Sequence, residues 1–464
     1  MKKTFTGHDL IALGYTPGKY FQPMLLIAQN LYSSQDDIPK VLGALDAFVA
    51  TLPVPPPTIP LQDQLEVQVF MDVPNQDCFE RSNALAAITH ANALSRVPTI
   101  RNVYVMPDAC PAGSEMGTIP VGCVAVAENA IHPGMHSADI CCSMFLSDYD
   151  ATLPVGEVLD AVQKHSHFGP SHRKEPLSLY LLDSFWDRVN LNPFLNNAQM
   201  RKAMEEHMGT QGDGNHFFFV GKSEQTSRMT FVTHHGSRKP GALLYKAGMK
   251  VAEEFRRRIS PATPKHNAWI PMDTVEGVNY WDALILIRDW TFVNHLAVHN
   301  EVRKALEIDQ HLNNWHWNEH NFVFLPDEHS NKYYHAKGST PMYKDDRSII
   351  PLNMGEPILI VQSHPDNTTK FAPHGAGRNM SRTQFMKQNA GKTVEQMMQE
   401  QVGHIDARFY TGISDASELP GAYKSAVDVQ RQIEHYKLAR IVDRIMPLGS
   451  MMAGESPQLW RNKQ

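Results

Sequence analysis

The chain has few cysteines, no excess of positive charge and no long apolar run. Only five of its 464 residues are cysteine, an odd number that forms no disulfide framework and is typical of a reduced, cytoplasmic protein. The formal net charge of −6 means that any nucleic-acid site has to be a local basic patch. No run of about 18 apolar residues occurs, so no membrane span is expected. Polar residues interrupt segment 1–21 too early for a signal peptide.

What the chain does contain is typical of a globular protein, with 42% hydrophobic and 20% charged residues. Apolar residues at helical spacing predict helix over 23–51, and the proline-rich stretch 53–60 predicts a stiff connector. Residues 1–60 are therefore expected to form a helical and proline-rich lead-in. Alternation over 65–73 then predicts a strand.

Farther along, strands and helices follow one another without a strict βαβ rhythm. Strands are predicted at 103–108, 120–127, 216–221, 228–235, 320–325 and 356–362, and helices at 242–258, 282–308, 382–407 and 421–440. This mixture predicts an α/β or mixed α+β fold with a mixed sheet. Because the elements interleave closely, a single domain over 1–464 is expected.

The stretch SADICCSM (137–144) places two adjacent cysteines, Cys141 and Cys142, after Asp139. Neighbouring cysteines rarely reach disulfide geometry. Thiolate and carboxylate together suit a divalent transition metal, whereas two small buried residues are the alternative interpretation.

Four other segments place a histidine beside a turn, mostly at a strand end. They are GTQGDGNHFFFV (209–220, His216), FVTHHGSRKPG (231–241, His234), NEHNFVF (318–324, His320) and FAPHGAGRNMSR (371–382, His374). Side chains at strand ends point into the crevice at a sheet edge, so ligands distant in sequence can converge there. Together with Asp139 and Cys142, these histidines predict a shared metal site.

The segment HGAGR joins His374 to two glycines and Arg378. Histidine is a covalent catalyst, and arginine offers a bidentate fork to phosphate. The segment therefore suggests attack by His374 on a nucleoside triphosphate, while a turn that binds nothing is the alternative.

These motifs resemble one known family over about residues 102–446. The resemblance depends on MPD (106–108), DICC (139–142), GNHF (214–217), HHGSR (234–238), EHNFV (319–323), IIPLNMG (349–355), HGAGR (374–378) and AYK (422–424). Their order is similar to that of the RtcB-type RNA ligases. The resemblance implies an RtcB-like fold, in which a mixed central sheet surrounds a dinuclear metal cleft, with 102–446 as the catalytic core.

The resemblance also implies a metal set and a reaction. Such enzymes join RNA 3′-phosphate or 2′,3′-cyclic phosphate ends to 5′-hydroxyl ends, in RNA repair or splicing, including tRNA splicing. Two manganese ions would be held by Asp139, Cys142, His216, His234 and His320. The family's cysteine lies three residues after its aspartate, which selects Cys142. Zinc or cobalt would also suit these mixed ligands.

By the same resemblance, His374 takes GMP from GTP and passes it to the RNA 3′-phosphate, which the 5′-hydroxyl then attacks. The expected nucleotide-binding residues are Asn215, His216, Phe217, Pro351, Asn353, Met354, Gly355, His374, Gly375, Ala376, Gly377, Arg378 and Tyr423. Arg238 and Lys337 are the expected RNA contacts.

The chain departs from the family pattern around the nucleotide. Phe219 stands where the family usually has a glutamate, and Leu352 and Asn353 replace a glycine and a serine. A divergent paralogue with weaker discrimination for guanine is therefore expected. Two alternatives remain open, a two-metal phosphoesterase acting on RNA 3′ ends and a non-catalytic protein that binds RNA ends. The physiological RNA, the oligomeric state and the need for an activating protein partner are also open.

Overall fold

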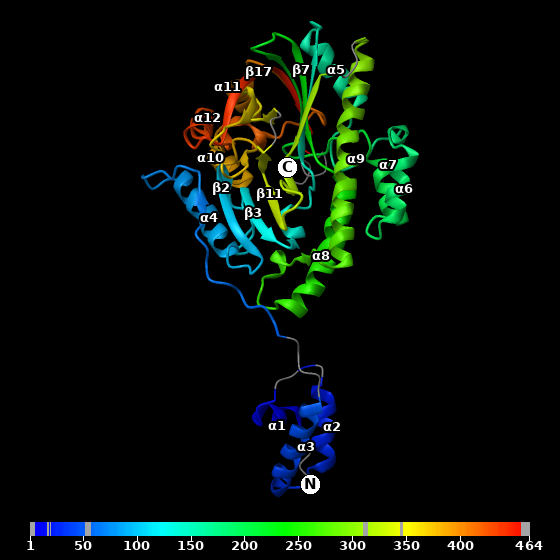
Figure 1. The fold of residues 1–464 in the computed structure, drawn as a ribbon. Helices are drawn as coiled ribbons and strands as arrows, with labels where there is room; N and C mark the ends of the chain where they lie inside the picture. Colours follow the sequence, from blue (N-terminus) through cyan, green and yellow to red (C-terminus); the bar gives the residue numbers. More distant parts are fainter. Residues whose placement is uncertain are drawn as a thin grey trace. The chain divides into compact units, whose positions relative to one another are not determined.

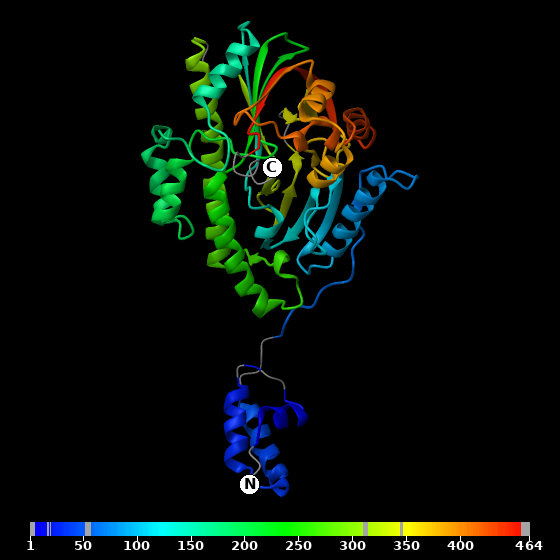
Figure 2. The ribbon, with the colours of Figure 1, turned by 180° about the vertical axis from the view of Figure 1, so that it is seen from behind.

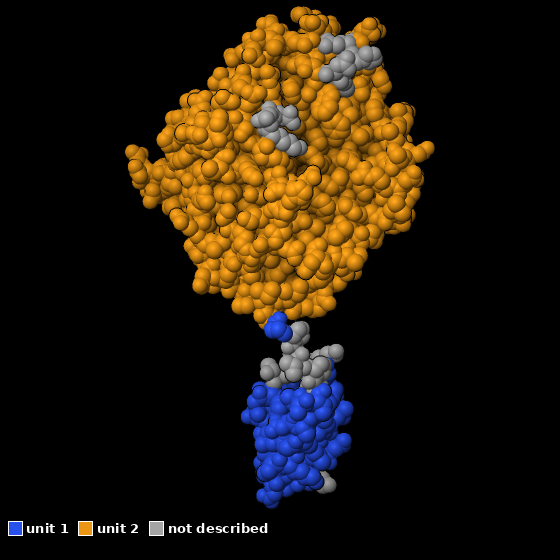
Figure 3. All heavy atoms as spheres, viewed as in Figure 1, with its two compact units in different colours: residues 1–57 blue, residues 58–464 orange. Residues whose placement is uncertain are grey.

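The computed structural model describes residues 5–15, 18, 20–51, 57–309, 314–343 and 347–455 (Figure 1). The chain divides into two compact units, residues 1–57 and 58–464 (Figure 3). Nearly the whole of the lead-in expected over residues 1–60 is thus a separate unit. This differs from the single domain expected over residues 1–464. The physical reason is that the helices of the lead-in bury their apolar residues against one another.

Unit 1 contains α1 (Gly7–Ala12), α2 (Phe21–Leu31) and α3 (Ile38–Thr51), which confirms the helix predicted over 23–51 but as two helices. The three helices share one hydrophobic cluster, whose buried members are Phe5, Leu10, Met24, Ala28, Val41 and Leu45. Half of the predicted proline connector, residues 53–56, lies outside the described residues.

Unit 2 is built on two large sheets. The eight-stranded sheet has the order β13–β14–β17–β6–β7–β5–β9, with β16 beside β17. Its strands are β5 (Ser143–Tyr149), β6 (Phe217–Ser223), β7 (Met229–His235), β9 (Trp315–Glu319), β13 (Ser348–Ile350), β14 (Ile358–Ser363), β16 (Asp406–Phe409) and β17 (Ala439–Met452).

The five-stranded sheet has the order β1–β2–β3–β11–β10. Its strands are β1 (Gln68–Val69), β2 (Ile100–Cys110), β3 (Val121–Glu128), β10 (Asn321–Phe324) and β11 (Lys332–Lys337). Two small sheets pair β4 (Ala130–Ile131) with β8 (Ile270–Pro271) and β12 (Ser339–Pro341) with β15 (Phe371–Pro373). Both parallel and antiparallel pairs occur, which confirms the mixed α/β class.

Helices cover the sheets from opposite flanks (Figures 1 and 2). On one flank α9 (Val275–Ala305) packs Val298 and Val302 against the eight-stranded sheet, and on the other α4 (Phe79–Leu94) covers the five-stranded sheet. The remaining helices of unit 2 are α5 (Val155–His165), α6 (Asp183–Leu191), α7 (Ala198–Glu206), α8 (Arg238–Ile259), α10 (Arg382–Gln388), α11 (Val394–Val402) and α12 (Ala426–His435).

The C-terminal third differs most from the predicted elements. The helix predicted over 382–407 is two helices, because the chain breaks at a turn around 389–392. The helix predicted over 421–440 covers only α12, and the chain then enters β17, which the sequence analysis missed. Charged residues and a β-bulge between Pro447 and Gly449 interrupt the alternation that marks a strand.

Within the described ranges, no helix combines the length and the apolar character that crossing a bilayer requires.

Candidate active site

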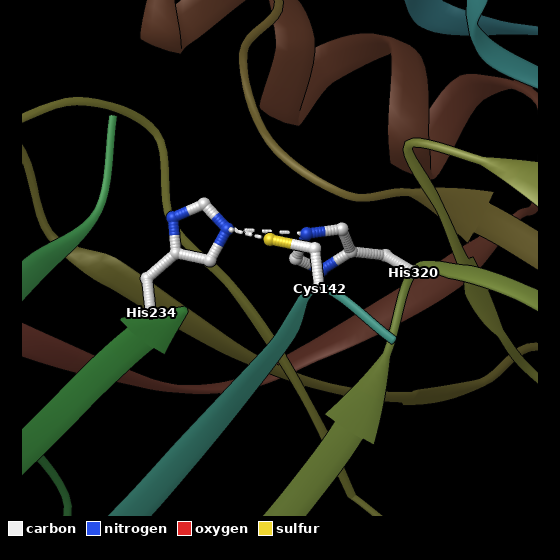
Figure 4. A group of neighbouring side chains, drawn as sticks. All are labelled: Cys142, His234 and His320. Atoms are coloured by element: carbon white, nitrogen blue, oxygen red, sulfur yellow. Dashed lines mark hydrogen bonds between the residues drawn. The ribbon is translucent and has the colours of Figure 1, made fainter. Parts of the chain in front are cut away.

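Three predicted ligands meet because the elements that carry them meet. Cys142 directly precedes β5, and the antiparallel pairing of Ser143 with His235 brings it beside His234 at the end of β7. His320 lies between β9 and β10, where the chain passes from the eight-stranded to the five-stranded sheet. Figure 4 shows these three side chains pointing toward one another.

The distances are those of a ligand cluster. Cys142 Sγ lies 3.1 Å from His234 Nε2, which lies 3.1 Å from His320 Nε2. On its other side, Cys142 Sγ lies 3.6 Å from His216 Nε2, which lies 3.1 Å from Asp139 Oδ2. The five side chains form two groups of three, each with its ligand atoms within 4.8 Å of one another, and Cys142 belongs to both.

Backbone carbonyls fix the tautomers of two of these histidines. His234 donates its Nδ1–H to Asn215 O at 3.1 Å, and His216 donates its Nδ1–H to Gln211 O at 2.7 Å. The proton on Nδ1 leaves Nε2 with a free lone pair, the usual arrangement of a ligand histidine. Both lone pairs face the cluster. The buried His320 Nδ1 has no hydrogen-bond partner among the residues that the structure describes.

The protonation states of the cluster suit a bound cation. Burial, together with the nearby charges of His216 and His374, lowers the pKa of His234 to about 3, so its imidazole is neutral. Burial opposes ionisation of Asp139, but its favourable interactions with His216, Cys142 and Arg238 together outweigh burial and lower the pKa of that carboxyl to about 2. Burial and the charge of Asp139 raise the pKa of the Cys142 thiol well above its usual value. A bound cation is what ionises such a thiol.

The donor set fits a divalent transition metal. One sulfur, one carboxylate and three imidazoles suit manganese, zinc or cobalt, and a shared sulfur suits a pair of ions. Gly236 leaves room for the carboxylate of Asp139 beside the cluster, because a side chain at this position would collide with that carboxylate. These residues therefore form a candidate dinuclear metal centre.

His374 follows β15 and lies next to the metal cluster. Its ring centroid is 4.9 Å from that of His320. The fully buried Asp108 accepts from His374 Nδ1 at 2.6 Å and from its backbone N–H at 3.2 Å. Asp108 therefore leaves Nε2 of His374 as the nucleophilic atom. The sequence analysis noted the MPD motif but gave Asp108 no role, because nothing in the motif identifies its partner 266 residues away.

A cavity of about 250 Å³ opens beside His374. Its wall includes eleven of the expected nucleotide-binding residues, namely Asn215, Phe217, Pro351, Asn353, Met354, His374, Gly375, Ala376, Gly377, Arg378 and Tyr423. His216 and Gly355 do not line it. Gly377 has a φ of +73°, and a side chain there would collide with the backbone of Asp108, so this turn requires glycine.

The cavity also contains an ion-pair cluster that the sequence analysis missed. The buried carboxylate of Glu418 accepts from Arg378 at 3.3 Å, from Tyr423 at 2.5 Å and from Arg382. Arg382 stood in the segment that contains His374, but no spacing in the sequence pointed to Glu418.

The two expected RNA contacts are both held by hydrogen bonds within the chain. Arg238 is half-buried at the start of α8 and donates to Gly169 O at 2.7 Å and to Thr210 Oγ1 at 3.3 Å. Lys337 ends β11 and donates to Ile119 O at 3.3 Å.

A comparison with known families now bears on this geometry. The model of the RtcB family, described as tRNA-splicing ligase RtcB, matches residues 187–453, more than half of the chain. The chain belongs to the RtcB family. The matched residues include His216, His234, His320 and His374, whereas Asp108, Asp139 and Cys142 precede the match.

Relatives in three organisms match with modest identity. The tRNA-splicing ligase RtcB of Aeropyrum pernix is 25% identical over 307 residues, which are 57% of this chain and 63% of that protein. The protein of the same name from Thermococcus kodakarensis is 23% identical over 295 residues, 54% of this chain and 60% of that protein. The RNA-splicing ligase RtcB homolog 2 of Entamoeba dispar is 23% identical over 300 residues, 56% of this chain and 57% of that protein. The chain thus spans less than two thirds of each relative.

Proposed function

We propose that this protein is an RNA ligase that joins RNA 3′-phosphate or 2′,3′-cyclic phosphate ends to 5′-hydroxyl ends through a histidine–GMP intermediate. Its relatives are named as tRNA-splicing or RNA-splicing ligases. The observation that carries the proposal is His374, oriented by Asp108 and packed against the metal ligand His320 at the mouth of a cavity. A phosphoesterase needs no such oriented nucleophile.

In the first step the Nε2 lone pair of His374 attacks the α-phosphorus of GTP. The N–P bond forms, the P–O bond to pyrophosphate breaks, and pyrophosphate leaves with the electron pair. Asp108 keeps the proton on Nδ1 and stabilises the positive charge that the ring acquires. This is the role of the aspartate in other histidine-based catalytic sites.

The candidate metal ligands lie beside His374, where bound ions would neutralise the charge of a nucleotide phosphate. Asp139, Cys142 and His216 would hold one ion and Cys142, His234 and His320 the other, with manganese proposed and zinc or cobalt also suited. Such ions neutralise phosphate charge and polarise the phosphoryl oxygens.

A 2′,3′-cyclic phosphate end must first be opened by water, which breaks the bond between phosphorus and the 2′-oxygen and leaves a 3′-phosphate. In the second step an oxygen of the RNA 3′-phosphate attacks the GMP phosphorus, and the N–P bond to His374 breaks. The 5′-hydroxyl of the other strand then attacks the activated 3′ end, and GMP leaves. Arg238 and Lys337 are proposed to contact the RNA phosphates. RNA repair and tRNA splicing in the cytoplasm are the proposed settings.

The proposal is tested by covalent labelling. The protein is incubated with manganese and α-labelled GTP and then denatured and separated on a gel. We expect label that survives denaturation, that disappears in His374→Ala and that persists in the matched control His435→Ala, an exposed histidine on α12. Absence of label, with release of phosphate from a 3′-phosphorylated oligonucleotide, would indicate the phosphoesterase instead. If neither occurs and RNA ends are still bound, the protein is a non-catalytic binder.

A further inference from the structure

The inference concerns the base of the nucleotide and rests on the proposed function. If the α-phosphorus bonds His374, the base has to occupy the part of the cavity away from that residue. Strand register identifies this part. Phe217 pairs with His234 of the metal cluster, whereas Phe219 lies two residues farther along β6 and pairs with Ser450 of β17. Both Phe219 and Ser450 line the cavity.

The wall of the cavity is largely apolar. Its apolar side chains include two phenylalanines together with aliphatic and thioether groups, namely Phe217, Phe219, Leu352, Met354, Ile358 and Met452. The rings of Phe217 and Phe219 are 6.5 Å apart and meet edge to face. Aromatic rings and thioethers bind the face of any base without reading its edge.

Glu418 is the one carboxylate among the described residues that line the cavity, and both of its oxygens already accept hydrogen bonds. One oxygen of Glu418 accepts from Arg382, and the other accepts from Arg378 and Tyr423. Arg378 itself also donates to Ser417 O at 2.9 Å. Among the described lining residues, no ionised acceptor is therefore free to pair with N1–H and the amino group of guanine, the contact that would separate guanine from adenine.

The polar groups that remain are neutral. The buried Ser450 makes no side-chain hydrogen bond within the described part of the chain, and the amides of Asn215 and Asn353 also line the cavity. A hydroxyl both donates and accepts, so Ser450 suits the oxygen of guanine and the amino group of adenine equally. A site rejects an analogue strongly only when the analogue leaves a buried polar group unpaired.

We propose that this cavity accepts purine nucleoside triphosphates with little discrimination between guanine and adenine, so that ATP as well as GTP serves as the nucleotidyl donor to His374. In either case the N–P bond forms at His374 Nε2 and pyrophosphate leaves. A pyrimidine covers less of the aromatic and thioether wall and is expected to react more slowly.

The test compares initial rates of His374 labelling with α-labelled GTP, ATP, CTP and UTP, each with manganese and below saturation. We expect the rates for GTP and ATP to lie within about tenfold of each other, a difference of about 1.4 kcal/mol, and both to exceed those for CTP and UTP by more than tenfold. A GTP rate more than tenfold above the ATP rate overturns the inference but leaves the proposed function intact. Equal rates for all four nucleotides also overturn it, and no label from any of them refutes the proposed function itself.

A matched pair of variants tests the role of Phe219. Phe219→Glu places a free carboxylate at the base and is expected to shift the GTP-to-ATP ratio toward GTP by more than tenfold, whereas Phe219→Leu should leave the ratio unchanged. An unchanged ratio in a folded Phe219→Glu protein would show that the base lies elsewhere. If Phe219→Glu does not fold, the ratio of the GTP rate to the ATP rate in the unaltered protein decides whether the inference holds.

Discussion

Cys141 and Cys142 are neighbours with opposite surroundings. Cys142 Sγ faces His234 and His216, whereas Cys141 belongs to the largest hydrophobic cluster and its backbone N–H donates to Asn321 O at 2.7 Å. Cys141 is thus a small buried residue, whereas Cys142 has the surroundings of a candidate metal ligand. The resemblance to the RtcB-type ligases, whose cysteine lies three residues after an aspartate, selected Cys142, and Cys142 is the cysteine that faces the cluster.

Exchange of each cysteine for alanine separates the two roles. Cys142→Ala removes a ligand shared by both groups of three and is expected to weaken manganese binding by more than about 100-fold. Cys141→Ala should leave the affinity nearly unchanged. Titration of the two purified variants with manganese measures the difference, and equal losses would contradict the assignment.

Asp108 has a residue-scale role that can be tested without removing the nucleophile. Asp108→Asn keeps the size of the side chain but removes the charge beside His374 Nδ1, and the rate of His374 labelling is expected to fall by about 10²- to 10⁴-fold. Manganese affinity should not change, because Asp108 is not a member of either ligand group. Asp366→Asn, which alters an exposed carboxylate paired with Lys437, is the control. A parallel loss of metal affinity would show that Asp108 acts on folding rather than on His374.

At the scale of elements, the sequence predicted where several strands lie but not which strands pair with one another. Segments 216–221 and 228–235 were predicted as strands and are β6 and β7. The pairing of β6 with β17, more than 200 residues later, has no local signal, because register between distant strands depends on packing across the whole sheet. For this reason the cavity wall contributed by β17 was not predicted.

A hydrogen-bonded chain of side chains joins β5, β7 and α9, and its members Ser143 and Thr233 are sequence neighbours of Cys142 and His234. Thr233 Oγ1 lies 2.7 Å from His295 Nδ1 and 2.9 Å from His299 Nε2. The far nitrogens of these histidines reach Ser143 Oγ at 3.0 Å and Ser147 Oγ at 2.7 Å. All five side chains are fully buried. The three elements therefore depend on one another for hydrogen-bond partners.

Thr233→Val breaks this chain at its centre with almost no change of volume. Two buried imidazole nitrogens lose their partner, at a cost of about 1–3 kcal/mol each. We expect the free energy of unfolding, measured with urea, to fall by about 2 kcal/mol or more. Thr89→Val, at an exposed position on α4, should change it by less than about 0.5 kcal/mol. Equal effects of the two changes would contradict the proposed link between the elements.

At the scale of the whole molecule, the sequence predicted the mixed class but not the division into two units. The class follows from alternation and helical periodicity, which are local. The boundary near residue 57 falls in the proline-rich stretch predicted as a connector, but a connector between units and a loop within one domain have the same composition. Only the separate apolar cluster of residues 5–48 distinguishes them.

Buried neutral histidines distributed over unit 2 predict how the whole molecule responds to acid. Burial lowers the pKa of His132 and His299 to about 3 and that of His136 to about 4, and each ring is hydrogen-bonded as a neutral group. In the unfolded chain a histidine has a pKa of about 6.5. Below that pH the unfolded state binds more protons than the folded state, so stability is lost as the pH falls from about 6.5 toward 4.

The loss should be on the order of 1 kcal/mol per pH unit for each such histidine, and stability should be nearly flat above pH 7. The paired carboxylates Asp139 and Glu253, whose pKa values lie at about 2, add their own loss only below about pH 4.5, so the interval between pH 6.5 and 4.5 isolates the histidines. Urea unfolding at pH 8, 7, 6 and 5, with a chelator present to exclude metal binding, measures the slope. His132→Gln should reduce that slope by the contribution of one proton, because glutamine keeps polar atoms but does not titrate. A stability that is constant or rises between pH 6.5 and 5 would mean that these imidazoles are accessible to protons in the folded protein.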